Sequence, residues 1–373
     1  MKTYALNLVL LFLGNFLLAQ SEEAQIKQTL SYYIDGTSYN KVDLIKKAFY
    51  PDAELFLDGK DGSLFVVASQ EYASWFEKGE RGEFNGRIGE ILSVDRFGNI
   101  ATAKVEILLP KAQKRFVDMF ILKKIEGEWK IISKTANSKP SNENGEKILF
   151  VVSNASFYGD SDLPTGNSFS EIVEAYHIYA EAGYNIDFVS PEGGSVPLAY
   201  INTSDNRQMQ YLYDNDLMYA LKNTKSPEQI QSADYKVIYY VGGGSAMFGV
   251  PENEKIQSLA MEIYEQQNGI VSAVCHGTAG IVNLKGSDGK YLYAGQTVNG
   301  YPEAYEATER PYFKTFPFLI QETIEERGGI FKVAARGTPH LESNERLVTG
   351  QNNLSAALVA KEIVAKLKLA EIK

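Results

Sequence analysis

A short apolar run that ends at the only cysteine of this 373-residue chain constrains the fold more than any other stretch. Residues 270–274, Ile-Val-Ser-Ala-Val, predict a buried strand, and the small residues after Cys275 predict a helix that begins there. Such a sharp turn lifts its central residue out of the sheet and requires a small residue two positions before and after it, here Ala273 and Gly277. A helix N-terminus favours the thiolate, so we expect Cys275 to be a nucleophile.

The chain from residue 147 to residue 373 alternates between apolar strands and helices. Strands are predicted at residues 148–152, 186–189, 236–241, 270–274, 297–298, 330–333 and 347–348. Helices are predicted at residues 167–182, 254–266, 276–282, 316–327 and 354–367, and a polar insertion with one helix, at residues 197–226, is expected to cap the site. Continuous apolar strands separated by helices predict an α/β doubly wound parallel sheet covered on both faces. Its site should lie at the carboxyl ends of the strands, where Cys275 falls.

Residues 21–137 predict a separate α+β unit. Helices are expected at residues 26–34, 42–49 and 70–76, and strands at 53–57, 64–67, 86–94, 100–109, 115–123 and 129–134. Helices followed by a long curved antiparallel sheet resemble the nuclear transport factor 2-like cone, in its lumazine-binding branch. Enzymes of that fold commonly use a His/Asp dyad, but all three histidines of this chain lie beyond residue 137.

The cone is therefore expected to be non-catalytic, with a role in binding an unknown ligand, in forming a homodimer or in scaffolding. Glu54 and Asp58 are candidate pocket residues, although charged residues at strand ends are usually solvated. Residues 138–146 are polar and rich in helix and strand breakers, which predicts a linker between the two units.

The first twenty residues predict a secretory signal. A charged start is followed by an apolar stretch from Leu6 to Leu18 and a small residue before a polar break. The stretch is shorter than the roughly twenty apolar residues of a membrane span, and no later stretch reaches that length. We expect export to a periplasmic or secreted location, where a lone cysteine is either an intermolecular bridge or a reactive thiol. The net charge of -10 argues against nucleic-acid partners.

Two segments could serve the thiol. The glycine-rich turn at residues 240–249 follows a buried strand, and the N–H groups near Gly243 and Gly244 could hold a developing oxyanion. A plain tight turn explains the same glycines. Glu171, in the first turn of the predicted helix at 167–182, could share a proton with the nucleophile if it is shielded, or could simply cap its helix. His276 is adjacent to Cys275, but a base also needs an orienting acid.

These motifs together resemble the PfpI branch of the class I glutamine amidotransferase-like superfamily, and within it the Hsp31-like chaperones and glyoxalase III proteins. The resemblance covers about Lys147–Lys368 and implies a flavodoxin-like sheet without a cofactor. It also implies that Cys275 is the nucleophile, His276 the base and Glu171 the partner of the thiol, with Glu174 as a competitor for that last role. The segment Gly300-Tyr301-Pro302-Glu303-Ala304-Tyr305-Glu306 points to Glu306 as the acid that orients the histidine, and residues 348–352 match a segment that packs near the site.

The chain departs from the pattern of that family at four positions. Gly244 replaces a histidine, Gly249 an aspartate, and Thr278 and Asn353 replace prolines. The oxyanion geometry and the shape of the substrate are therefore open. Some members of the family carry zinc ligands, and this sequence has no visible counterpart of them. His177 and His340 are expected to be structural.

Three functions remain. The first is a cofactor-free enzyme for small reactive carbonyls such as methylglyoxal, by hydration to a hydroxy acid or by deglycation. The second is an amidase or peptidase that uses the same Cys-His-Glu site. The third is a non-enzymatic chaperone, ligand-binding protein or redox sensor. A thiol pKa near the free value of about 8.5 would favour the third function, and a lower pKa would favour catalysis.

Overall fold

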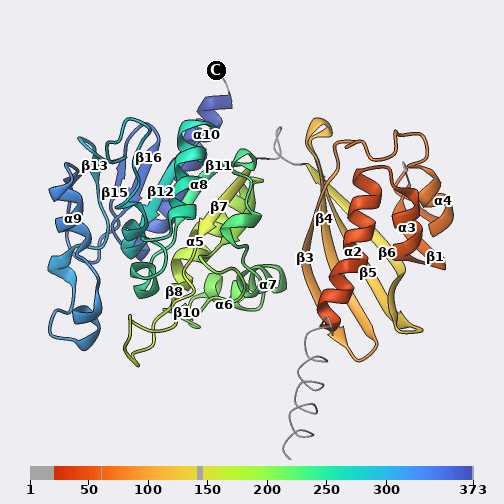
Figure 1. The fold of residues 1–373 in the computed structure, drawn as a ribbon, viewed down its shortest axis with the longest axis horizontal. Helices are drawn as coiled ribbons and strands as arrows, with labels where there is room; N and C mark the ends of the chain where they lie inside the picture. Colours follow the sequence, from red (N-terminus) through yellow and green to blue (C-terminus); the bar gives the residue numbers. More distant parts are fainter. Residues whose placement is uncertain (1–20, 60, 141–145, 372–373) are drawn as a thin grey trace, which may run out of the picture. The chain divides into compact units, whose positions relative to one another are not determined.

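The computed structural model describes residues 21–59, 61–140 and 146–371, in two compact units that divide between Ser141 and Asn142 (Figure 1). The predicted signal at residues 1–20 lies outside the described residues, and it stays a prediction. In the described part of the chain, no helix has the length and apolar character to cross a membrane.

In its described residues, 21–59 and 61–140, the N-terminal unit is one six-stranded sheet with three helices (Figure 1). Its elements are α2 (Glu22–Ser38), α3 (Val42–Ala48), β1 (Phe49–Asp58), β2 (Leu64–Ala68), α4 (Ser69–Ser74), β3 (Ile88–Phe97), β4 (Ile100–Leu109), β5 (Lys114–Ile125) and β6 (Glu128–Pro140). The strand order is β2-β1-β6-β5-β4-β3, and every pair is antiparallel except β1 with β6. The order and type of the elements confirm the predicted cone.

The core of this unit lies where the alternation of apolar residues places it. Ala101, Ala103, Val105 and Ile107 of β4 are buried, together with Leu30 and other apolar residues of α2. Strand β6 continues to Pro140, whereas the sequence predicted an end near residue 134 and a linker from 138. The extra residues pair with β5, because Ala136 lies opposite Asp118 and Ser138 lies opposite Phe116. Residues 141–145 of the predicted linker lie outside the described residues.

A buried polar cluster inside the cone was not predicted from the sequence. Lys134 and Asp118 form an ion pair at 2.9 Å, and both side chains are at most 4% exposed. The Tyr33 hydroxyl donates to the other Asp118 oxygen at 2.5 Å and lies 3.2 Å from the Tyr72 hydroxyl. Glu54 and Asp58, the candidates chosen from the sequence, are exposed and do not belong to this cluster. Strand alternation alone does not tell which charged residue on the inner face has a partner.

The C-terminal unit is a doubly wound sheet (Figure 1). Its helices are α5 (Phe169–Glu181), α6 (Asn206–Leu212), α7 (Asn215–Lys222), α8 (Glu254–Glu265), α9 (Ile320–Glu326) and α10 (Ala356–Glu371). Its main strands are β7 (Lys147–Val151), β9 (Asn185–Val189), β11 (Tyr235–Tyr240), β12 (Ile270–Val274), β15 (Leu341–Ser343) and β16 (Leu347–Gly350). Two small sheets pair β8 (Asn167–Ser168) with β10 (Leu198–Ala199) and β13 (Thr297–Val298) with β14 (Ile330–Phe331).

The strand order β15-β16-β12-β11-β7-β9 confirms the predicted flavodoxin-like topology. The five parallel strands, taken in chain order, lie as 2-1-3-4-5, and only β15 is antiparallel. Both faces are buried, because Ile148 and Phe150 of β7 pack with α5 and α10 while Leu149 and Val151 pack with α8. A ligand crevice is expected where the chain reverses its direction of winding, between the carboxyl ends of β7 and β11.

Three predictions of secondary structure in this unit were wrong. The insertion at residues 197–226 holds two helices, α6 and α7, because Asp205 and Asp214 each cap a separate helix with their side chains. The predicted helix at 276–282 is a 3₁₀ turn, Cys275–Ile281. Its two glycines disfavour an α-helix. The predicted helix at 316–327 begins only at Ile320.

We predict that Lys134→Met destabilises the N-terminal unit by about 3–5 kcal/mol, because it leaves the Asp118 carboxylate buried and unpaired. Both tryptophans of the chain, Trp75 and Trp129, lie in this unit, so tryptophan fluorescence during urea unfolding of the whole protein reports on it alone. Lys114→Met, at an exposed position of β5, is the control and should change the stability by less than about 0.5 kcal/mol. Equal stability of the two variants would contradict the buried ion pair.

Candidate active site

Cys275 sits in a strained turn at the carboxyl end of β12. Its φ of 57° lies in the left-handed region, which a residue other than glycine adopts at a cost of roughly 1–3 kcal/mol. The close approach of the turn to β11 explains why Gly277 is a glycine, since a Cβ there would overlap the Tyr240 carbonyl oxygen. The Tyr301 N–H donates to the Cys275 carbonyl oxygen at 3.2 Å and holds the turn from the other side. The turn predicted from Ala273 and Gly277 is therefore present.

Residues from three other segments meet at this turn. Glu171 comes from the start of α5, Gly243 from the turn after β11, and Glu306 from the loop that follows β13. All of them line one cavity of about 700 Å³ together with Cys275 and His276. The cavity lies at the carboxyl edge of the sheet, where residues that follow β7, β11 and β12 meet, and it includes the point between β7 and β11 at which the winding reverses.

Cys275, His276 and Glu306 form a continuous chain of polar contacts. The Cys275 Sγ lies 3.6 Å from His276 Nδ1, and His276 Nε2 lies 2.6 Å from Glu306 Oε1. The carboxylate accepts a hydrogen bond from the Nε2–H group, so that Nδ1 is left as the acceptor that faces the thiol. The Tyr312 hydroxyl donates to the second Glu306 oxygen at 3.0 Å and fixes the carboxylate. The His276 ring stacks on Tyr301 with 4.7 Å between ring centroids.

Glu171 approaches the thiol from the opposite side and is 1% exposed. The Gly242 N–H donates to Glu171 Oε2 at 2.8 Å, and the Gly242 carbonyl oxygen accepts from the Ser168 N–H at 2.9 Å. A Cβ at position 242 would stand 2.5 Å from the same carboxylate oxygen, so only glycine allows this approach. Burial raises the pKa of the Glu171 carboxyl to about 7, against the opposing effect of the Gly242 N–H. Glu171 can therefore take up or release a proton near neutral pH.

The thiol is not favoured as a thiolate, in contrast to the expectation from the sequence. Burial raises the pKa of the Cys275 thiol well above its usual value, and the negative charge of Glu171 raises it further. The short 3₁₀ turn also offers little of the dipole that a long α-helix would provide. The thiolate therefore has to form by proton transfer to a neighbouring base, and His276 Nδ1 is in position to accept that proton.

The two predicted oxyanion donors differ in position. Gly243 lines the cavity with a φ of 100°, and within the described part of the chain no hydrogen-bond partner is recorded for its N–H. Gly244 instead packs against Tyr158, whose hydroxyl would overlap a Cβ at that position. The Tyr158 hydroxyl, 3.5 Å from the Tyr200 hydroxyl, thus occupies the space that a larger residue at 244 would fill.

The sequence did not predict the aromatic and basic wall of the cavity. This wall comprises Tyr158, Tyr200, Tyr301, Tyr312, Phe316, Arg310 and Arg336. Most of these residues lie in irregular segments, for which apolar periodicity carries no signal. Tyr200 follows β10 in the predicted cap. With a φ of 56°, it is, after Cys275, a second residue of the site in the left-handed region.

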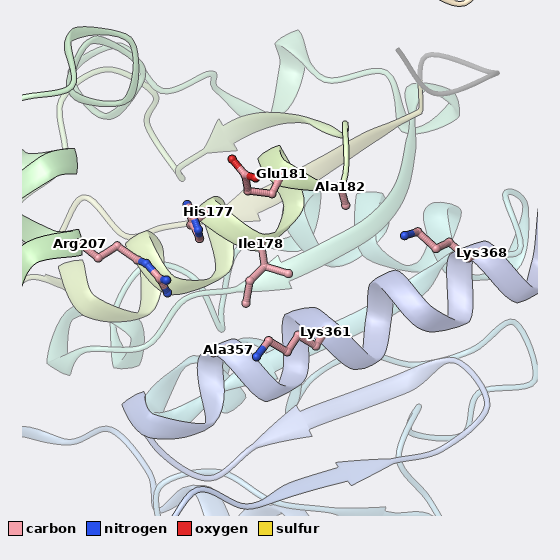
Figure 2. A pocket seen from close by; sticks show the side chains of 8 residues that line it. All are labelled: His177, Ile178, Glu181, Ala182, Arg207, Ala357, Lys361 and Lys368. Atoms are coloured by element: carbon pink, nitrogen blue, oxygen red, sulfur yellow. The ribbon is translucent and has the colours of Figure 1, made fainter. Parts of the chain in front are cut away.

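The competing residues lie elsewhere. Glu174 pairs with Arg207 at 2.6 Å and does not line the cavity, so Glu171 is the carboxyl that faces the thiol. His340 contacts Glu342 at 2.9 Å. His177 contacts the Tyr211 hydroxyl at 3.0 Å and lines a separate groove of about 380 Å³ between α5 and α10, where Figure 2 shows it beside Arg207. Among the described residues, no group of three His, Cys, Asp or Glu side chains is arranged to hold a metal ion.

Comparisons with known proteins match each unit separately. The DJ-1/PfpI family matches residues 164–314, and a family described as "Putative lumazine-binding" matches residues 21–136. Glutathione-independent glyoxalase hsp3101 of Schizosaccharomyces pombe is 27% identical over 237 residues, which cover 58% of this chain and 94% of that protein. "Probable glutathione-independent glyoxalase hsp3104" of the same organism is 31% identical over 156 residues, 40% of this chain and 68% of that protein. The crystal structure of glyoxalase III from Candida albicans matches with a TM-score of 0.54 at 23% identity over 60% of this chain and 97% of that chain, which shows the same fold.

We predict that Glu171→Gln lowers the pKa of the Cys275 thiol, because it removes a negative charge that raises this pKa. The rate of alkylation by iodoacetamide, measured against pH, should rise at a lower pH in the variant than in the wild type. The chain has no second cysteine, so the label reports on Cys275 alone. Glu174→Gln, one turn further along α5, is the control and should leave the profile in place. An unchanged profile in Glu171→Gln would contradict the arrangement described here.

Proposed function

We propose that this chain, which belongs to the DJ-1/PfpI family and is an enzyme of the PfpI type, converts small α-oxoaldehydes such as methylglyoxal into hydroxy acids. The observation that carries the proposal is the row Cys275–His276–Glu306, with Glu171 on the other side of the thiol. Relatives described as glutathione-independent glyoxalases match nearly their whole length to the unit that holds these residues.

The reaction begins with the formation of the thiolate. His276 Nδ1 accepts the thiol proton, and Glu306 stabilises the resulting imidazolium through Nε2. The sulfur then forms a bond to the aldehyde carbon C1, and the C1 carbonyl oxygen becomes an alkoxide. The Gly243 N–H stands at the cavity to hold this oxygen, and the imidazolium returns a proton to it. The product of this step is a hemithioacetal on Cys275.

An internal redox step and a hydrolysis complete the turnover. A base removes the proton from C1 and the neighbouring C2 gains a proton, so that C1 is oxidised to a thioester while the C2 ketone is reduced to an alcohol. Glu171 suits this transfer, because a carboxyl with a pKa of about 7 both accepts and donates a proton near neutral pH. Water then cleaves the thioester, which releases the hydroxy acid and restores the thiol. The sum is one aldehyde and one water to one hydroxy acid, with no external oxidant or reductant.

The roles of the other parts of the chain stay predictions. We propose export through the signal at residues 1–20, a homodimer, and an unknown ligand in the N-terminal cone. The support for a ligand is the buried cluster of Asp118, Lys134 and Tyr33, since buried charges are costly to keep without a use. A chaperone activity has no support beyond the resemblance to Hsp31-like proteins.

Cys275→Ser should abolish the formation of lactate from methylglyoxal, because an alcohol is far less readily ionised than a thiol by the same base. Lactate is measured with an enzyme-coupled assay under initial-rate conditions. His340→Gln, at a histidine that contacts Glu342 and does not line the cavity, should keep the activity. Turnover in the Ser variant equal to the wild type would refute the mechanism. Cleavage of a peptide library by the wild type without lactate formation would instead favour the amidase.

Glu306→Gln should lower kcat by about 10²- to 10⁴-fold, because the neutral amide no longer stabilises the His276 imidazolium or selects the tautomer with a free Nδ1. Glu303→Gln is the matched control on the same segment. Its carboxylate accepts from the Glu322 N–H at 3.0 Å and does not line the cavity, so kcat should stay near the wild-type value. A similar kcat in both variants would show that Glu306 does not orient the base.

A further inference from the structure

Two arginines line the mouth of the Cys275 cavity without a carboxylate partner. Arg310 and Arg336 are both exposed, and within the described residues the structure records no ion pair for either guanidinium. Glu309 neighbours Arg310 in sequence but does not line the cavity. These two positive charges line one cavity of a chain whose net charge is -10.

The acidic residues of the cavity do not neutralise these arginines. Glu171 accepts from the Gly242 N–H, and Glu306 is engaged by His276 and Tyr312. Both carboxylates lie at the buried end of the cavity, on either side of the thiol, while the arginines are exposed. The two ends of the cavity therefore differ in chemistry. Its buried end holds the groups that can transfer protons, and its exposed end carries positive charge.

Both arginines are attached to the segments that build the site. Arg336 stands over the Tyr305 ring, 5.9 Å from its centroid, and Tyr305 accepts a hydrogen bond from the hydroxyl of Tyr301, the ring that stacks on His276. The Arg310 N–H donates to the Ala307 carbonyl oxygen at 2.9 Å and closes the turn directly after Glu306. Two different loops thus bring Arg310 and Arg336 to the lining of the same cavity.

The size of the cavity points in the same direction. A volume of about 700 Å³ exceeds what a molecule as small as methylglyoxal can fill, and cavities of about 300–1,000 Å³ typically enclose much larger ligands. A substrate that places its aldehyde at Cys275 has room for a substituent that extends to the opening. The planar fork of arginine matches carboxylate and phosphate groups with two parallel hydrogen bonds.

We infer that Arg310 and Arg336 bind an anionic group, a carboxylate or a phosphate, at the end of the substrate remote from its reactive carbonyl. The enzyme would then select α-oxoaldehydes with a negative charge over neutral ones such as methylglyoxal. This inference rests on the proposed function for the identity of the reacting group. The preference for a negative charge does not depend on turnover and can be measured separately.

The first test uses two alkylating reagents that differ mainly in charge. Iodoacetate is an anion and iodoacetamide is neutral, and each forms a sulfur–carbon bond to the Cys275 thiolate with release of iodide. The ratio of the two rates, iodoacetate over iodoacetamide, cancels differences in the pKa of the thiol between variants. We expect Arg310→Gln and Arg336→Gln each to lower this ratio by about two- to fivefold, from Coulomb's law at a solvent-like dielectric constant. The double variant should lower it by the product of the two effects.

The controls separate a local charge from the total charge. Lys290→Gln removes one positive charge from an exposed side chain that pairs with Asp288 and does not line the cavity, so its ratio should equal that of the wild type. Arg310→Lys keeps the charge and should keep most of the ratio. Added salt should lower the wild-type ratio more than that of the double variant. An arginine whose removal leaves the ratio unchanged does not bind the anion, and a fall in Lys290→Gln equal to theirs would overturn the inference.

The second test measures turnover. The aldehyde 4,5-dioxopentanoate carries a carboxylate, its methyl ester is the neutral match, and hydroxypyruvaldehyde phosphate tests a phosphate in the same place. We expect kcat/KM to be higher for the carboxylate than for the ester, or for the phosphate ester than for free hydroxypyruvaldehyde, with the preference lost in the double variant. Turnover of all these aldehydes without any charge preference would overturn the inference and leave the proposed function intact. No turnover of any aldehyde, with the alkylation ratio still dependent on the arginines, would reject the proposed function alone.

Discussion

The left-handed backbone of Cys275 is the constraint on which the site depends. A φ of 57° at a residue other than glycine is unfavourable by itself, and it persists here because the surrounding structure leaves no alternative. Strand β12 pairs with β11 on one side and with β16 on the other. The turn after it lies so close to β11 that a Cβ on Gly277 would overlap the Tyr240 carbonyl oxygen. The thiol is consequently presented at the end of the sheet rather than packed within it.

Two carboxyl groups flank this thiol and differ in what surrounds them. Glu171 is buried with one backbone N–H as a donor, so its pKa rises to about 7, whereas Glu306 faces a histidine and a tyrosine hydroxyl. The first group can exchange a proton near neutral pH, and the second holds the His276 ring in place. Burial and the Glu171 charge raise the pKa of the thiol, which disfavours the thiolate, and His276 Nδ1 is in position to accept its proton. The cavity thus combines a protonated resting thiol with an acceptor 3.6 Å away.

The N-terminal cone also contains a buried carboxylate whose surroundings supply its partners. Asp118 is buried, one of its carboxylate oxygens pairs with Lys134, and the second oxygen accepts a hydrogen bond from the Tyr33 hydroxyl. Strand alternation predicted which face of this sheet is buried, since Ala101 and Val105 point inward as expected. The same alternation could not identify Asp118 and Lys134 as a pair, because they come from different strands whose register is set only when β5 and β6 align.

The sequence by itself determined both folds and the place of Cys275 in a sharp turn at the end of a strand. The local patterns are the apolar periodicity, the spacing of small residues around Cys275 and the change to alternating strands and helices near residue 147. Such patterns can be recognised in the sequence without knowledge of the fold. The resemblance to a known family assigned roles to His276 and Glu171 and added Glu306, and the fold does bring all three together around the thiol. Only the tertiary structure decided the choice of Glu171 over Glu174, the place of the Tyr158 hydroxyl beside Gly244, the raised pKa of the thiol, and the two arginines at the opening. Each of these depends on burial or on contacts between residues far apart in the chain, and neither quantity exists until the chain has folded.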